Sequence, residues 1–346
     1  MTDGPAEAPS GDAAIPAPPL ADRLKAQAPY WTVPGLALLG LVLIADFSTW
    51  GTLTLAGLAM GMLIFIMASG LTLVFGLMDV LNFGHGAFIS IGAFVGATVL
   101  LALGGWTGSD SLALNLAAVL LAILAAMLAT GGLGWFFERV IVRPVYGAHL
   151  KQILVTMGGL IVAEELIHLL WGPNQIPLPR PELLKGSWVI GDVIVERFRL
   201  LAVVLGAAIF AGLRFALVRT RLGLLIRAGV ENGEMVEALG YRVRRLFVLV
   251  FVAGSALAGL GGVMWGLYDE IITAQMGLNI LVLVFIVVII GGLGSVEGCF
   301  IGALLVGLMA NYTGFLAPKV ALGSNILLMV LILMWRPRGL LPAGKG

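Results

Sequence analysis

Charged residues are scarce in this chain, and residues that commonly perform chemistry are scarcer still. Only 11% of the 346 residues are charged, whereas soluble domains carry roughly 25%. There are three histidines and a single cysteine, Cys299, which excludes an internal disulfide and a cysteine-based metal cage. Neither a phosphate-binding GxxxxGK[ST] pattern nor an HExxH pattern occurs. We therefore expect no catalytic residues, no metal and no cofactor in this chain, and the net charge of +1 predicts no nucleic-acid partner.

Apolar residues, in contrast, make up 60% of the chain and form long uninterrupted runs. Segments 47–78, 111–137, 246–268 and 271–296 contain no Asp, Glu, Lys or Arg. About 20 predominantly apolar residues let a helix cross a bilayer, whereas strands of a membrane β-barrel alternate between apolar and polar residues. The sequence therefore predicts an all-α integral membrane protein, a bundle of about 8–10 transmembrane helices. The predicted spans are residues 31–46, 53–77, 85–103, 112–137, 152–171, 200–218, 246–268, 279–293, 298–316 and 323–335.

Lysine and arginine in the connecting segments predict how the chain is oriented. Segment 214–245 contains seven arginines and three glutamates, so we place it in the cytoplasm. Counting spans outward from there places both termini in the cytoplasm and residues 172–199 outside. This external loop holds four prolines and charges of both signs, and we expect it to be ordered.

The domain organisation follows from one change in composition. Residues 1–30 are rich in alanine and proline, without an apolar core, and are predicted to be a disordered cytoplasmic tail. Residues 31–342 then form a single transmembrane domain. Transport is the default function for a many-span chain that offers no set of reactive side chains.

Segment 71–89 joins two apolar runs but is too short and too apolar for an ordinary loop. Glycines here permit unwound or closely packed backbone, and Asn82 and His85 add hydrogen-bonding groups. Unwound backbone inside a membrane survives only where it is buried in protein or lines a cavity. Two interpretations stay open, a broken helix that lines a translocation path and a tight cytoplasmic turn. The candidate path residues in this region are Thr72, Asn82, Phe83, His85 and Gly86.

The basic segment 219–245 contains a second candidate site. Residues 231–241 are predicted to form a short helix that ends at Gly240. Met235, Val236, Ala238 and Leu239 are predicted to form a small apolar face, and acidic residues lie on another face. Such a helix suits docking into a groove on a partner protein, and a solvated positive loop is the alternative. The candidate docking residues are Glu231, Glu234, Met235, Glu237, Ala238, Leu239 and Gly240.

Two carboxylates, Glu164 and Glu165, fall inside the fifth predicted span. Charged residues inside a membrane are costly and usually mark a function or a partner. Glu164 and His168 are four residues apart, so they share one face of a helix. We expect either a structural pair near the external surface or a role for Glu164 in the translocation path.

Several motifs together resemble the branched-chain amino acid ABC permeases. They cover about residues 53–342, in the family's order and at its spacing. The motifs are residues 70–76 (GLTLVFG), 81–88 (LNFGHGAF), 219–223 (RTRLG), 237–240 (EALG), 289–298 (IIGGLGSVEG) and 335–340 (WRPRGL).

The resemblance implies the membrane subunit of an importer in the bacterial inner membrane. It implies four kinds of partner: a second related permease, two ATPase subunits that bind ATP, a periplasmic substrate-binding protein and membrane lipid. The helix around 231–241 would be the coupling helix seated on an ATPase. Ala87 stands where many relatives carry an acid, so urea, short amides and small carboxylates remain alternatives to branched-chain amino acids. A secondary transporter or a channel is the alternative outside the family.

Overall fold

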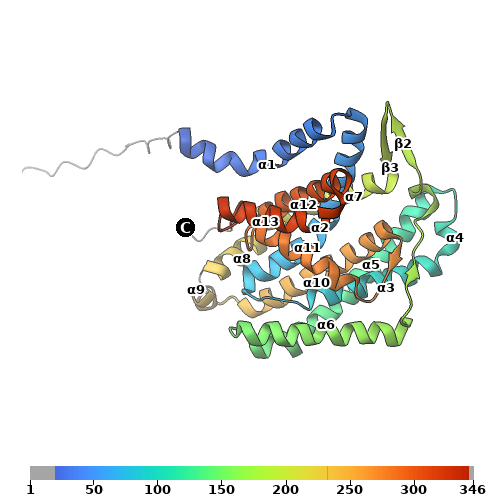
Figure 1. Ribbon diagram of the computed structural model, residues 1–346. Helices are drawn as coiled ribbons and strands as arrows, with labels where there is room; N and C mark the ends of the chain where they lie inside the picture. Colours follow the sequence, from blue (N-terminus) through green and yellow to red (C-terminus); the bar gives the residue numbers. More distant parts are fainter. Residues whose placement is uncertain (1–19, 232, 343–346) are drawn as a thin grey trace, which may run out of the picture.

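The computed structural model describes residues 20–231 and 233–342. Within these ranges, eight helices are long and apolar enough to cross a membrane, and two shorter apolar helices accompany them (Figure 1). The all-α membrane bundle predicted from the sequence is thus confirmed. The helices are α1 (Leu20–Ile44), α2 (Phe47–Met78), α3 (His85–Ala102), α4 (Gly104–Thr107), α5 (Leu112–Phe137), α6 (His149–Trp171), α7 (Arg197–Arg219), α8 (Arg221–Glu231), α9 (Gly233–Ala238), α10 (Val243–Asp269), α11 (Met276–Gly291), α12 (Val296–Leu316) and α13 (Ala321–Trp335).

Short elements connect these helices. Two antiparallel two-stranded sheets pair β1 with β4 and β2 with β3. A π-helical turn continues α5 without a break. The bounds are β1 (Ile176–Pro177), β2 (Ser187–Ile190), β3 (Val193–Glu196), β4 (Ile271–Ile272), and turns η1 (Glu138–Val142), η2 (Arg143–Val145), η3 (Glu182–Leu184) and η4 (Pro318–Val320).

The N-terminal helix differs from its prediction. It begins at Leu20, so residues 20–30, which the sequence assigned to a disordered tail, are helical in the structure. The rest of that predicted tail, residues 1–19, lies outside the described residues. The turn into α2 is capped by Asp46, whose carboxylate accepts a hydrogen bond from the Thr49 amide at 2.8 Å. Hydrogen bonds from Thr49 hold the pKa of this carboxyl below its usual value.

The centre of the bundle is formed by α2 and α10, which run antiparallel and approach backbone to backbone. Gly70 of α2 faces Gly254 of α10, and a Cβ at Gly254 would lie 2.7 Å from the Gly70 carbonyl oxygen. On its other side, α2 packs as closely on α12, where a Cβ at Gly61 would lie 2.7 Å from the Ala303 carbonyl oxygen. Small residues let membrane helices gain dispersion contacts that lipid cannot replace. Any larger side chain at these positions would force the helices apart.

Two structurally related halves run in opposite directions through the bundle. The run α2–α3–α5–α6 and the run α10–α11–α12–α13 have equivalent partners, since α2 packs on α12 as α10 packs on α5. Asp79 and Glu270, 191 positions apart, end α2 and α10 with the same left-handed conformation. Gly86 and Gly277, also 191 positions apart, touch each other. Inverted repeats of this kind are common in membrane transport proteins.

One end of the bundle, here called the hairpin end, is covered by residues 172–196. Their predicted order is confirmed by β1, η3 and the β2–β3 hairpin, and Figure 1 shows the hairpin extending from this end. Arg180 fixes this segment to the last turn of α10, because it donates hydrogen bonds to the carbonyl oxygens of Leu267 and Tyr268, both at 2.8 Å. Its guanidinium also lies 3.2 Å from carboxylate oxygens of Glu196 and Glu270.

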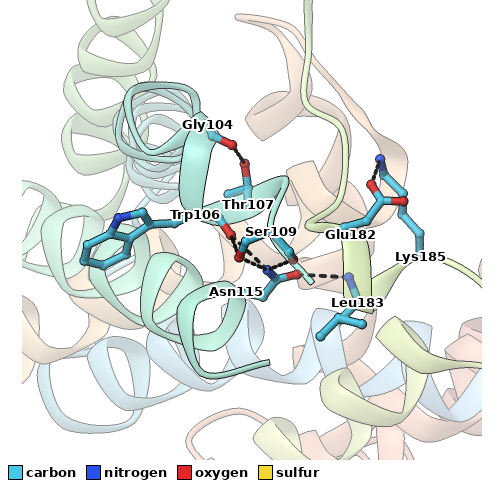
Figure 2. A network of polar contacts seen from close by, with 8 residues as sticks. All are labelled: Gly104, Trp106, Thr107, Ser109, Asn115, Glu182, Leu183 and Lys185. Carbon is cyan, nitrogen blue, oxygen red and sulfur yellow. Dashed lines mark hydrogen bonds and ion pairs between the residues drawn. The ribbon is translucent and has the colours of Figure 1, made fainter. Parts of the chain in front are cut away.

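A buried amide holds the same segment to α5. The Asn115 side chain donates to the carbonyl oxygens of Trp106 and Ser109, both at 2.9 Å (Figure 2). Its oxygen accepts a hydrogen bond from the Leu183 amide, also at 2.9 Å. One asparagine therefore joins the α4 turn, the start of α5 and η3.

The opposite end, here called the α9 end, contains α8, α9 and the C-terminal segment after α13. The amides of Leu340 and Leu341 donate to the carbonyl oxygens of Ile290 and Gly291, so residues 339–341 lie along the turn between α11 and α12. Gly292 in this turn has a φ of +99°. Two of the motifs named above, 289–298 and 335–340, therefore bind each other.

Candidate functional site

The connection between α2 and α3 re-enters the bundle. Its clearest marker is a hydrogen bond of 2.9 Å between His85 Nε2 and the carbonyl oxygen of Met67. Met67 lies eleven residues before Met78, the last residue of α2, which corresponds to about 16 Å along a helix. Since His85 is the first residue of α3, this helix begins deep inside the bundle rather than at its surface. A tight turn at the end of the helices does not describe this segment.

Polar atoms without protein partners collect around this break. Asn82 and His85 are almost completely buried, and neither the Asn82 amide nor His85 Nδ1 has a hydrogen-bond partner among the described residues. Gln152 of α6 is equally buried and its Oε1 is also unpaired in that part of the chain. Buried polar atoms normally find partners, so unpaired ones mark places where a solute or water belongs.

The neighbouring candidate residues shape the break itself. The Phe83 amide donates to Thr156 Oγ1 of α6 at 3.1 Å, and the Phe83 ring packs on Phe285 of α11. Gly86 meets Gly277 at the start of α11, where a Cβ at Gly86 would lie 3.0 Å from the Gly277 carbonyl oxygen. The first turns of α3 and α11 thus lie against each other in the bundle interior.

Neither Thr72 nor Glu164 forms a hydrogen bond with the residues of this break in the described part of the chain. Thr72 is fully buried on α2 beside the Cys299 thiol of α12. Glu164 is partly buried on α6, and its Oε1 has no partner among the described residues. The ion pair in this turn joins Glu165, not Glu164, to His168 at 3.8 Å. His168 thus forms its ion pair with Glu165, while Glu164 interacts with His168 electrostatically without an ion pair within 4 Å.

The second candidate site, at the α9 end, contains the segment predicted to be helical over 231–241, within which residue 232 lies outside the described residues. Helix α8 ends at Glu231, and α9 extends only from Gly233 to Ala238. Gly240 has a φ of +86°, and the Tyr241 amide donates to the Val236 carbonyl oxygen at 3.2 Å, as in a glycine-capped helix terminus. The predicted stop at Gly240 is thus explained by its left-handed conformation.

The apolar residues of this segment differ in how far their side chains are exposed. Val236 is buried and anchors α9, whereas Met235, Leu239 and Tyr241 are 60%, 70% and 51% exposed. Glu237 and Ala238 are exposed beside them. The side chains of Glu231 and Glu234 lie outside the described residues. The exposed surface formed by Met235, Leu239 and Tyr241, here called the α9 surface, has the apolar character of a docking site.

Sequence reasoning missed the polar residues that other helices bring to the break. Gln152 and Thr156 are four residues apart on α6, a spacing that predicts a shared face, but nothing in the sequence placed that face against Phe83. Ser90 is another such residue, because its hydroxyl accepts from the Gly277 amide at 2.9 Å and donates to the Ala274 carbonyl oxygen at 2.7 Å. Among the described residues no group of His, Cys, Asp and Glu could hold a metal ion.

These features define a multi-pass membrane protein with a re-entrant break at its centre and an exposed helix at one end. The family model for the permease component of branched-chain amino acid transport systems matches residues 53–335, and the chain belongs to this family. The resemblance drawn from the motifs is thereby confirmed.

Individual relatives match over most of the chain. It is 29% identical over 296 residues to the high-affinity branched-chain amino acid transport system permease protein BraD of Pseudomonas aeruginosa. The aligned region covers 82% of this chain and 93% of BraD. LivH of Escherichia coli K12 is 29% identical over 294 residues, with the same coverage. LivM of the same organism is 28% identical over 324 residues, covering 84% of this chain and 70% of LivM. No solved structure matches the chain significantly.

Proposed function

We propose that this chain is the permease subunit of an ABC importer that moves branched-chain or related amino acids across the bacterial inner membrane. It pairs with a second related permease, receives substrate from a periplasmic binding protein and is driven by two ATPase subunits that bind the ATP. The observation that carries the proposal is the α9 surface, an exposed apolar patch on a glycine-capped helix at the arginine-rich end of the bundle. The names of BraD, LivH and LivM support the substrate class and the pairing.

In this proposal the α9 end is cytoplasmic and the hairpin end faces the periplasm. The seven arginines of segment 214–245 favour that orientation. Both termini are then cytoplasmic.

The mechanical link from the ATPases to the path is α10. This helix begins at Val243, directly after the α9 surface, and packs along α2, α3 and α5. It meets the first half of α3 where Gly92 faces Gly259. A displacement of α9 on ATP binding therefore moves α10 next to the break that holds Asn82 and His85. Substrate transport then follows from a shift between outward-open and inward-open populations.

The translocation path runs past the break between α2 and α3. The unpaired amide of Asn82 and the free Nδ1 of His85 offer both donors and acceptors to a small polar solute. Glu164 contributes a carboxylate nearer the hairpin end of α6. Ala87, an alanine where many relatives carry an acid, keeps urea, short amides and small carboxylates as alternative substrates.

Leu239→Glu tests the function directly. The chain is reconstituted into liposomes with its partner permease and ATPases, and the substrate-binding protein is added on the side opposite the ATPases. Uptake of radiolabelled leucine is then measured with ATP on the ATPase side. We expect at least about tenfold slower uptake, because a charge replaces an apolar contact at the proposed docking site. Val189→Glu is the matched control, since Val189 is 68% exposed on the hairpin at the opposite end.

Three results would contradict the proposal. One is normal uptake by the Leu239→Glu protein, and another is equal loss in the Val189→Glu control. The third is leucine uptake that continues without ATP but collapses with a protonophore, which would indicate a secondary transporter.

A further inference from the structure

A groove of about 1320 Å³ runs between α5 and α10 in the half of the bundle nearest α9. Its walls are apolar, with Leu124 and Leu128 on the α5 side and Val248 and Val252 on the α10 side. Gly132 lines the groove without a side chain, and an added Cβ there would meet nothing within 4 Å. The groove is therefore open space rather than a closed packing defect.

One end of this groove is strongly basic. Arg139 and Arg143 reach it from the end of α5, and Arg242 and Arg245 reach it from the start of α10. None of these four arginines forms an ion pair within the described part of the chain. The acid buried among them, Glu138, accepts a hydrogen bond of 2.6 Å from the Tyr146 hydroxyl. Arg139 lies 5.6 Å over the Trp135 ring, and Glu237 is a second acid in the lining, so the arginines at this end still outnumber the acids.

The dimensions of the groove match one leaflet of a bilayer. Along α10 it extends from Arg244 to Ala256, twelve residues or about 18 Å. Half the hydrocarbon thickness of a bilayer is about 15 Å. The arginines therefore lie at headgroup level when the apolar walls lie at the level of the acyl chains.

The equivalent surface in the other half of the bundle is covered by protein. The contact between α2 and α12 corresponds to the contact between α10 and α5, and α1 and α7 pack over it. The described chain has no such helix over the groove between α5 and α10. Its occupant must come from outside the described chain.

We propose that this groove binds one anionic phospholipid. The phosphate is held by the arginines at its basic end, and the acyl chains lie along the apolar walls of α5 and α10. Basic pockets between membrane helices suit anionic headgroups, and arginine binds phosphate through charge-assisted hydrogen bonds. A transmembrane helix of a second permease would satisfy the apolar walls but would leave the arginines unpaired. The proposal follows from the architecture of the chain and does not depend on its transport role.

Native mass spectrometry of the purified full-length protein tests the proposal. The protein is incubated with equal amounts of phosphatidylglycerol and phosphatidylcholine. We expect one phosphatidylglycerol per chain, retained at least about tenfold over phosphatidylcholine. The double variant Arg139→Gln with Arg245→Gln should weaken this binding by about 30-fold, since each basic residue near an anionic surface contributes about fivefold.

Two matched controls separate the groove from general charge and bulk. Arg219→Gln with Arg221→Gln removes two exposed arginines at the same end that also lack an ion pair among the described residues. Gly132→Leu fills the groove, whereas Gly212→Leu adds the same side chain to open space on α7. Only the groove variants should lose phosphatidylglycerol.

Three outcomes would overturn the proposal. Equal retention of both lipids would remove the selectivity for anionic headgroups. Equal loss in the Arg219 and Arg221 control would attribute binding to net charge. Unchanged binding in the Gly132→Leu protein would place the lipid outside the groove.

Discussion

Gly240→Ala is the substitution that most directly tests how α9 is held in place. Helix α9 has only six residues and cannot be stable on its own. It is fixed by the burial of Val236 and by the turn at Gly240, whose φ is +86°. An added Cβ at Gly240 would meet nothing within 4 Å, so steric clash with neighbours plays no part. The cost is the left-handed conformation itself, about 1–2 kcal/mol for a residue with a Cβ.

That cost corresponds to about a tenfold rise in the population in which the turn is open. Amide hydrogen exchange measures it directly. The amides of Gly240 and Tyr241, which donate to Glu237 and Val236, should exchange about tenfold faster in the alanine variant. Gly240→Asn should have a smaller effect, since asparagine tolerates this conformation better than alanine. Coupling of ATP hydrolysis to transport should fall in the same order.

Gly212→Ala is the matched control for this experiment. Gly212 lies within α7 with open space around it, so alanine there should leave exchange at α9 unchanged. Equal protection of Gly240 and Tyr241 in wild-type and Gly240→Ala proteins would refute the reasoning. It would mean that contacts other than the glycine turn fix α9.

Three further substitutions probe the fold. Arg180→Met should lower the free energy of unfolding by about 3 kcal/mol, measured by thermal unfolding in detergent, because it removes hydrogen bonds to two carbonyl oxygens and the ion pairs with Glu196 and Glu270. Asn115→Leu should cost about 3 kcal/mol and expose the Leu183 amide to exchange. Gly277→Val should prevent recovery of monodisperse protein, because its Cβ would overlap the Gly86 carbonyl oxygen, while Gly158→Ala, with open space, should behave as wild type. Wild-type stability of the Arg180, Asn115 or Gly277 variant would contradict the contacts described for that residue.

The sequence predicted those elements whose signal is local. Long apolar runs define α2, α5 and α10 almost to the residue, because crossing a membrane requires a continuous apolar helix whatever surrounds it. The stop at Gly240 was also predictable, since a left-handed turn favours glycine. The start of α1 at Leu20 was missed because the preceding composition is that of a disordered segment.

Elements whose position depends on tertiary contacts could not be predicted. The depth at which α3 begins is set by the hydrogen bond from His85 to Met67 and by the contact of Gly86 with Gly277. Neither contact has a sequence signal. The groove was missed for the same reason, because Arg139 and Arg245 meet only when α5 packs on α10. The sequence shows each arginine-containing segment separately, and only the fold shows that the segments around Arg139 and Arg245 come together.

Co-purification from the native membrane tests the central claim most directly. The tagged chain is isolated in a mild detergent, its partners are identified by mass spectrometry, and ATP-driven leucine uptake is measured after reconstitution. We predict recovery of a second permease and an ATPase pair, with uptake that requires ATP and the substrate-binding protein. Recovery of the chain alone or as a homo-oligomer, with solute flux independent of ATP, would contradict the account.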